Sequence, residues 1–155
     1  MKKKLKFALF ALNSESGIAM TTSKKRWSAK TNEIIKVVKF CDKYFDYIFS
    51  VQRWLGFGGK TDPAGLTYDS ANFISAISSI SKKINLIVTM HTSIIHPTHA
   101  ARIMSTIDQF SNGRSLCPQF LTALPIICSI LLILYHGSNI CTCLINLKSK
   151  PSDPA

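Results

Sequence analysis

Polar side chains stand at the ends of three apolar stretches of this sequence, and they are the residues best suited to hold a ligand. They are Asn13, Gln52, Arg53, Thr89 and His91. In α/β proteins the carboxyl ends of parallel strands meet at one edge of the sheet, and ligands bind at that edge. If the three stretches are such strands, the sequence predicts a binding site where they end.

The roles of single residues within this group stay open. Arg53 is either a ligand contact or an ordinary surface arginine. His91 is a candidate proton donor or ligand contact, and equally a hydrogen-bonded structural residue at a strand end. No Ser/His/Asp set and no pair of carboxylates stands at a useful spacing, so the sequence identifies no catalytic residue.

The stretch 45–51 and the loop behind it organise the chain. Residues 45–51 are mostly apolar and aromatic, which is typical of a parallel strand covered on both faces. The loop that follows is rich in glycine, which allows tight turns and a close approach to a ligand. Residues 59–61 look like the end of a phosphate-binding P-loop, but Trp54 stands where that motif needs its first glycine, which excludes it.

Strands and helices are predicted to alternate along the first part of the chain. Thr31 can cap a first helix, Thr67 or Asp69 begins a second, and Pro97 suits the first position of a third. Three strand–helix repeats favour a parallel α/β architecture, although the pattern does not decide between an open sheet and a barrel. The predicted strands are residues 7–12, 45–51 and 84–90.

Composition excludes several classes of function. The chain has 19 Lys and Arg against 8 Asp and Glu, but much of this excess lies in residues 2–6 and 24–26, which is typical of a solvated terminus and loop. No nucleic-acid surface is therefore expected. The five cysteines form no C-x-x-C pair, which predicts neither a disulfide framework nor a metal site. A reducing, cytoplasmic location is expected.

The character of the chain changes after Arg114. Residues 115–147 contain no Asp, Glu, Lys or Arg, and residues 121–135 are nearly all apolar. That apolar run is short for a membrane span of ~20 residues, so a membrane anchor is an alternative and not the preferred interpretation. We predict two parts, namely a domain over residues 1–114 and an apolar, charge-poor tail over residues 115–155.

Three blocks of residues 6–114 carry a family likeness. They are KFALFALNSESGIAMTT, FDYIFSVQRWLGFGGKTD and HTSIIHPTHAARIMSTIDQFSNGR. With these blocks the chain resembles the luciferase-like flavin-dependent monooxygenases, and the second block is most like the pyrimidine and alkanesulfonate monooxygenase type. The resemblance implies a TIM barrel, of which residues 1–114 are the N-terminal portion, with about three of the eight βα units.

The resemblance also implies a cofactor, partners and site residues. The cofactor is reduced FMN from a separate flavin reductase, the other reactants are molecular oxygen and a small organic substrate, and full-length members form homo-oligomers. In the family the pair after the second strand contacts FMN, which corresponds to Gln52 and Arg53 here. Thr89 and His91 would face the same cavity from the third strand, and Asn13 from the first.

The sequence departs from the family after residue 114. The family continues with a strand that carries an Asn and a Gly-Trp pair, and SLCPQFLTALPIICS has neither. The sequence analysis therefore predicts an incomplete barrel and, as a hypothesis, a frameshift or early stop. The expected function is a monooxygenase with impaired or no activity; the alternative is a non-catalytic membrane-associated protein anchored by the apolar tail. The substrate is not identified.

Overall fold

The chain folds as a parallel four-stranded sheet with helices on one side. This structure is a computed structural model that describes residues 5–91 and 94–117. The strands lie in the order β1-β2-β3-β4 and every neighbouring pair is parallel. In chain order the elements are β1 (Ala8–Phe10), a 3₁₀ helix (Glu15–Ile18), α1 (Thr31–Tyr44), β2 (Tyr47–Phe49), α2 (Ser70–Ser78), β3 (Asn85–Ile87), α3 (Pro97–Ser111) and β4 (Ser115–Leu116).

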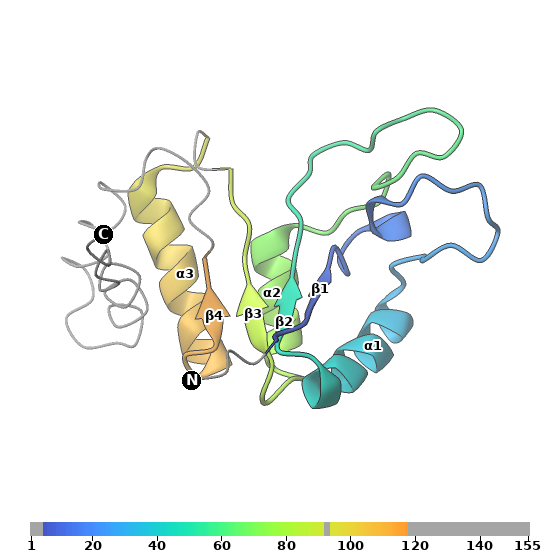
Figure 1. The fold of residues 1–155 in the computed structure, drawn as a ribbon. Coiled ribbons are helices and arrows are strands. Elements are labelled where there is room, and N and C mark those ends of the chain that lie inside the picture. The colour runs from blue at the N-terminus through green and yellow to red at the C-terminus, as the bar shows by residue number, and fades with distance from the viewer. Residues whose placement is uncertain (1–4, 92–93, 118–155) are drawn as a thin grey trace, which may run out of the picture.

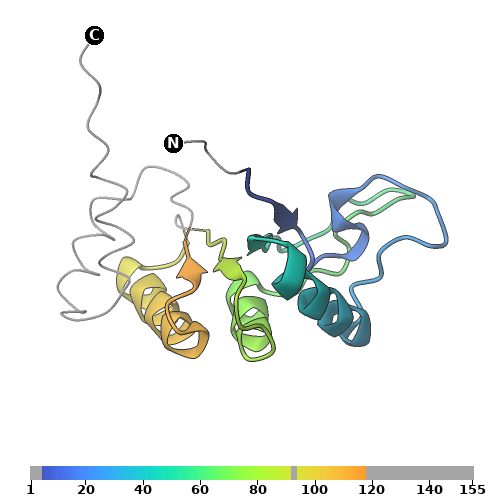
Figure 2. The same cartoon turned by 60° about the horizontal axis from the view of Figure 1, so that its bottom comes forward.

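Each strand directs alternate side chains to opposite faces of the sheet. Leu9, Ile48 and Leu86 lie side by side in the register, and Ile48 and Leu86 are fully buried under the helices. The neighbouring row faces away from the helices, and Phe10 at the β1 edge is 47% exposed. The prediction that the strands are covered on both faces is therefore wrong for the described residues, because all three helices lie on the same side (Figure 2).

The helices bury apolar stripes against the sheet, as their spacing predicts. α1 buries Ile34 and Val38 at helical spacing. Its first residue is Thr31, and the cap position is Lys30 without a side-chain bond, so the predicted threonine cap is wrong. Asp69 does cap α2, because its carboxylate accepts a hydrogen bond from the backbone N–H of Asn72 at 2.9 Å.

The third repeat begins at Pro97, as its sequence predicts, and it leads into an additional strand. Pro97 opens α3, and Asn112 closes it in the left-handed conformation with φ of 54°. Ser115 then pairs with Leu86, and its hydroxyl donates to the buried carboxylate of Asp108 at 3.2 Å. The domain boundary at residue 114 stays a prediction, while β4 is a strand that the sequence analysis did not anticipate.

Arg114 joins this last strand to the end of α2. Each of its five N–H groups donates a hydrogen bond to the protein. The acceptors are the carbonyl oxygens of Ser78, Ser81, Ile84 and Ser111 and the hydroxyl of Ser81. Burial lowers the pKa of Arg114, and the nearby Asp42 carboxylate opposes that shift.

Asp42 fixes the same corner of the fold from α1. One of its carboxylate oxygens accepts backbone N–H groups of Lys82, Lys83 and Ile84 at 2.8 to 3.0 Å. Burial alone raises the pKa of Asp42, but these three hydrogen bonds and Arg114 outweigh it, so the pKa lies below its usual 3.8. The carboxylate therefore stabilises the folded chain above about pH 4, and this contribution is lost as the pH falls through the lowered pKa.

The substitution Asp42→Asn tests this contribution. We expect the variant to lose about 1 kcal/mol of unfolding free energy at pH 7, since a neutral amide oxygen replaces a charged acceptor. The difference from the parent chain should shrink below pH 4, where the parent carboxylate becomes protonated. Urea unfolding of both chains between pH 2.5 and 7 measures this. Glu33→Gln, at an exposed carboxylate in the first turn of the same helix, is the control.

No helix in residues 5–91 and 94–117 is long and apolar enough to cross a membrane. The apolar run 121–135, on which the membrane alternative rests, lies outside the described residues. The predicted tail over residues 115–155 is described only as far as residue 117.

Candidate functional site at the strand ends

The five predicted site residues lie at one edge of the sheet. Asn13, Gln52 and Thr89 follow the carboxyl ends of β1, β2 and β3, which point the same way in the parallel sheet (Figure 1). Arg53 and His91 follow one and two residues further along. The structure therefore brings the five together at one rim, while their roles in binding a cofactor stay predictions.

Asn13 connects the ends of β1 and β2. Its side chain is fully buried and makes three hydrogen bonds, all to backbone groups. The amide nitrogen donates to the carbonyl oxygens of Val51 at 2.7 Å and Tyr68 at 2.8 Å, and its oxygen accepts the N–H of Val51 at 2.9 Å. Because both N–H donors are used and the side chain is fully buried, Asn13 positions the residues after β2 and presents no free group to a ligand.

Gln52 reaches from the end of β2 to the start of α2. Its amide oxygen accepts the N–H of Ser70 at 2.7 Å, and its amide nitrogen donates to the carboxylate of Asp69 at 3.0 Å. The first N–H groups of a helix lack partners within the helix, so Gln52 and Asp69 together satisfy two of them. This arrangement fixes the glutamine in a single orientation at the rim.

The buried hydroxyl groups of Ser50 and Ser70 and the half-buried Thr89 connect β2, α2 and β3 through a chain of hydrogen bonds. The hydroxyl of Ser50 donates to the carbonyl of Ile87 at 2.9 Å, and the hydroxyl of Ser70 accepts the N–H of Thr89 at 2.9 Å. The two serine oxygens are 2.5 Å apart, and since Ser50 uses its hydrogen on Ile87, Ser70 must be the donor between them. The hydroxyl of Thr89 returns to the carbonyl of Ser50 at 2.6 Å. The strand ends and α2 are thus held in a fixed arrangement.

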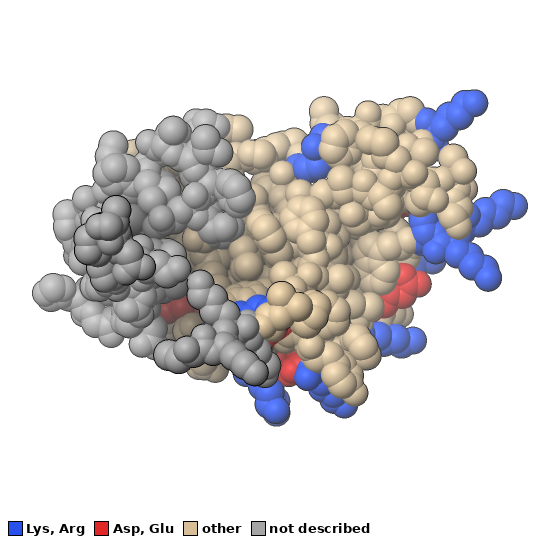
Figure 3. Space-filling model, viewed as in Figure 1, with Lys and Arg blue, Asp and Glu red and all other residues tan. Residues whose placement is uncertain are grey.

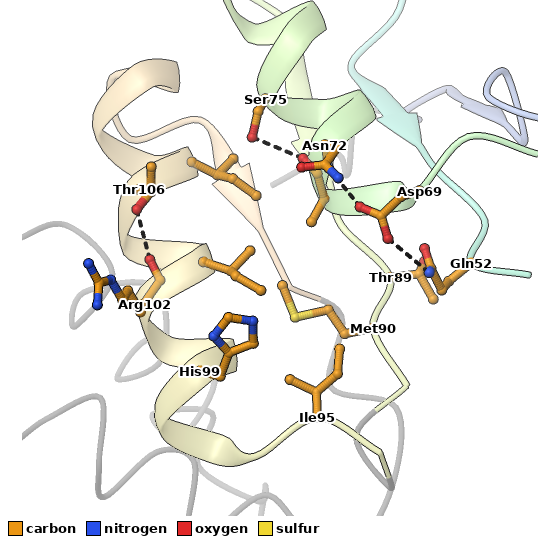
Figure 4. Close-up of a pocket in the computed structure, with 13 residues that line it drawn as sticks. Gln52, Asp69, Asn72, Ser75, Thr89, Met90, Ile95, His99, Arg102 and Thr106 are labelled. Atoms are coloured by element: carbon orange, nitrogen blue, oxygen red, sulfur yellow. Dashed lines mark hydrogen bonds between the residues drawn. The ribbon is translucent and has the colours of Figure 1, made fainter. Parts of the chain in front are cut away.

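A pocket of about 510 Å³ opens beside this junction, between α2 and α3. Gln52 and Thr89 lie on its rim, and Figure 4 shows the cap residue Asp69 and Asn72 of α2 across from His99 of α3. Met90 and several isoleucines supply apolar walls. Gln52 and Thr89 therefore face the helix side of the rim, where their hydrogen-bonding groups are already occupied by the protein.

Arg53 presents free hydrogen-bond donors at the rim. Its guanidinium carbon lies 3.7 Å above the ring of Phe57, and its Nε donates to the carbonyl of Leu55 at 3.1 Å. These two contacts hold the planar group in place. Within the described residues the two terminal nitrogens make no hydrogen bond, so four N–H groups remain for an anionic or carbonyl oxygen of a ligand.

His91 lies beside the same loop. Its ring centroid is 6.2 Å from that of Trp54, whose side chain is 70% exposed. The Nε2 atom of His91 is buried and has no hydrogen-bond partner among the described residues. A buried polar atom without a partner costs free energy, which a ligand can recover by bonding to it.

The glycine-rich loop is ordered around Asp62. This carboxylate accepts the N–H of Gly58 at 2.7 Å, and side chains at Gly56 or Gly65 would lie within 2.4 Å of its oxygens. A hydrogen bond from the N–H of Gly65 to the carbonyl of Asp62 closes a turn over residues 62–65. These glycines therefore make room for an internal carboxylate, and residues 59–61 lead into a turn and no helix, unlike a P-loop.

Sequence reasoning missed the residues that hold the rim together. Ser50 stands at the end of an apolar strand and Ser70 directly after the Asp69 cap, and both side chains are fully buried. Serine is too common in loops and caps for its type to indicate a buried junction. The alternation of buried and exposed positions in β2 offered a signal, since it places Ser50 on the same face as Ile48.

Comparison with known proteins defines the class of protein. No protein-family model matches the chain. Among solved structures, a riboflavin lyase with modified FMN and riboflavin is 25% identical, with a TM-score of 0.59 over 74% of this chain and 29% of its own. An EDTA monooxygenase from Chelativorans shares the fold with a TM-score of 0.63 over 81% of this chain and 32% of its own, at 20% identity. The fold is that of the TIM-barrel-like luciferase-like flavin monooxygenases, of which the chain matches part.

The curated relatives share a more specific activity than the structural neighbours do. A pyrimidine monooxygenase RutA of Pseudomonas savastanoi is 38% identical over 80 residues, which are 51% of this chain and 22% of that protein. A second RutA, from Rhizobium rhizogenes, is 38% identical over 74 residues, or 47% of this chain and 20% of its own. The resemblance to luciferase-like flavin-dependent monooxygenases is confirmed, with pyrimidine monooxygenases as the curated homologues. The chain spans about a fifth of the length of these relatives.

Proposed function

We propose that this chain supplies the first strand ends of a site for reduced FMN in a flavin-dependent monooxygenase that acts on a small organic substrate. The observation that carries the proposal is the pair of unsatisfied groups at the rim. The terminal nitrogens of Arg53 and the Nε2 of His91 have no partner within the described residues. The homologues are monooxygenases, and one structural neighbour was solved with modified FMN.

The residues present suit a flavin. A guanidinium placed over the ring of Phe57 can donate to the electronegative oxygens of a flavin or its substrate, and His91 can donate or accept one hydrogen bond. When bound, reduced FMN supplies the activation of molecular oxygen. The chain itself contributes orientation: Asn13 and Gln52 fix the end of β2 next to Arg53, and Thr89 fixes the end of β3 two residues before His91.

The reduced cofactor is proposed to arrive from a separate flavin reductase. A pyrimidine is the first substrate to test, since the curated relatives are pyrimidine monooxygenases. Membership of a homo-oligomer stays a prediction. Little or no turnover is expected from the isolated chain, because the described sheet of four strands leaves the face opposite the helices open and does not exclude water.

An FMN-binding measurement distinguishes a specific contact with Arg53 from a general electrostatic attraction of FMN to the basic chain. We expect FMN to bind saturably in a flavin fluorescence titration, and Arg53→Ala to weaken binding about tenfold. Lys60→Ala removes an exposed cation from the same loop and should leave the affinity unchanged. Equal effects of the two substitutions, or no effect of Arg53→Ala, would refute the proposed contact.

Turnover is measured separately, with a flavin reductase, NADH, FMN and uracil. Uracil-dependent oxygen consumption should not exceed the rate measured without the chain. A clear excess would show that the described strands suffice for catalysis and would overturn the expectation of impaired activity.

A further inference from the structure

A hollow of about 500 Å³ lies at the end of α1, at the edge of the sheet where the strands begin and opposite the rim. Its walls come from the C-terminal half of α1 and from Ile80 and Lys82, which follow α2. A hollow of this size suits one small ligand. Figure 3 shows lysine and arginine atoms along the lower edge of the molecule, where α1 ends in Figure 1. We call this feature the α1-end hollow.

Side chains of α1 reach the α1-end hollow in two rows. Lys39 and Lys43 form one row, because residues four apart are neighbours on a helix surface. Phe40 and Tyr44 form the adjacent row in the same way. All four side chains are exposed, unlike the stripe that α1 buries against the sheet. The walls that α1 supplies are therefore accessible to a ligand.

Three ammonium groups line the α1-end hollow without an acidic partner. Lys82, in the loop after α2, joins Lys39 and Lys43, and none of the three side chains makes a hydrogen bond or ion pair within the described residues. Asp42 also lines the hollow, but one oxygen of its carboxylate already accepts three backbone N–H groups, and the charge of Arg114 lies nearby. The hollow therefore keeps an excess of positive charge.

The arrangement of these cations is unfavourable for the free chain. Lys39 and Lys43 are like charges four residues apart, a spacing at which like charges destabilise a helix. The helix dipole favours cations only in the last turn, which contains Lys43, and it does not explain why Lys82 of another segment faces the same hollow. An anion among the three ammonium groups would remove the repulsion. The charges therefore predict an anionic ligand.

The aromatic row offers a second kind of contact. The ring centroids of Phe40 and Tyr44 are 4.7 Å apart, and the two side chains are 55% and 67% exposed. Phe45 lies behind them, with its ring centroid 6.4 Å from that of Phe40. Exposed aromatic rings stack with nucleobases, and lysines bind phosphate groups as point charges. The two rows together therefore match a planar ring that carries phosphate.

We propose that the α1-end hollow binds a free nucleotide, with its base against the aromatic row and its phosphate groups among the three lysines. A membrane surface fits less well, because the lysines and rings surround a hollow and do not lie on a plane. A single nucleic-acid strand needs a basic groove several nucleotides long, whereas these cations line one hollow. The proposal does not rest on the proposed function, since the hollow and the rim lie at opposite edges of the sheet.

Competition against a fluorescent nucleotide tests the proposal on the full chain. The probe is ADP with a methylanthraniloyl label on its ribose, and its binding is followed by fluorescence anisotropy. Unlabelled ADP should displace the probe at a concentration about tenfold lower than adenosine or pyrophosphate requires, since each of these keeps only one of the two contacts. ADP is chosen in place of FMN so that the hollow is measured separately from the rim.

Two sets of substitutions should separate the two contacts. Lys39→Gln/Lys43→Gln should weaken the binding of ADP and of pyrophosphate about tenfold and leave adenosine unchanged. Tyr44→Ala should weaken ADP and adenosine about tenfold and leave pyrophosphate unchanged. The matched control Lys24→Gln/Lys25→Gln removes the same charge from the loop after β1 and should leave all three affinities unchanged.

Four results would overturn the proposal. The first is no saturable binding of the probe, and the second is an equal loss in the control pair, which would indicate attraction to the overall charge. The third is pyrophosphate as effective as ADP, which would leave only a general anion patch. The fourth is displacement by an oligothymidylate at a lower nucleotide concentration than ADP, which would assign the hollow to single-stranded nucleic acid.

A rim variant keeps this outcome separate from the proposed function. Arg53→Ala should bind ADP as the parent chain does, because Arg53 lies at the opposite edge of the sheet. A loss of ADP affinity in Arg53→Ala equal to that in Lys39→Gln/Lys43→Gln would place the nucleotide at the rim and contradict the site at the α1-end hollow.

Discussion

Replacement of Arg114 by methionine is expected to lower the free energy of unfolding by roughly 4 kcal/mol, because four carbonyl groups and one hydroxyl lose a charged donor at once. Methionine keeps the length of the aliphatic stem, so the loss reports the hydrogen bonds more than packing. Urea unfolding followed by circular dichroism measures the difference.

Two further substitutions keep this prediction testable if the methionine variant does not fold. Arg114→Lys retains the charge but offers at most three donors, so a loss of roughly half that size is expected. Arg102→Met, at an exposed arginine of α3, should change stability by less than about 0.5 kcal/mol. Equal losses at the two arginines would contradict the role assigned to Arg114.

Asn13→Ala is expected to cost about 3 kcal/mol of unfolding free energy, because the buried N–H of Val51 and two carbonyl groups lose their partners. Asn13→Asp should cost at least as much, since a carboxylate cannot donate to the carbonyls of Val51 and Tyr68. Asn72→Ala, at an exposed position of α2, is the control and should be nearly neutral.

The same variants distinguish a positioning role from direct contact with a ligand. If Asn13 acts only through the backbone, a folded Asn13 variant should lose FMN affinity in proportion to its loss of order at residues 51–53, as seen in hydrogen exchange. Lost affinity with unchanged protection of these amides would assign Asn13 a direct contact and contradict the positioning role.

Much of the fold could be predicted, because local signals and global topology agree. Pro97 and the Asn112 cap bound α3 closely, and apolar spacing identified the buried stripe of α1. The open face of the sheet could not be predicted, since apolar composition indicates burial without saying on which faces. The prediction that Thr31 caps α1 was wrong because threonine serves equally as a first helical residue, and here Lys30 is the cap residue.

The position of the rim residues was predicted more successfully than the role of each side chain. Parallel topology alone puts Asn13, Gln52 and Thr89 at one edge, so residue order was sufficient. Which side chain is free was not predictable, because that depends on partners distant in sequence. Asn13 bonds to residues 38 and 55 positions away, and Thr89 to Ser50, 39 positions away. Arg53, by contrast, has local contacts, and its two terminal nitrogens have no partner among the described residues.

The hydrogen bonds that join Ser50, Gln52 and Thr89 to the start of α2 determine how rarely this helix separates from the strand ends. To separate α2 from the strand ends, four or more of these bonds must break together, at a cost of roughly 4 kcal/mol, so fewer than about one molecule in a thousand is open at any time. The start of α2 is therefore a rigid side of the rim, to which a ligand must fit without displacing it.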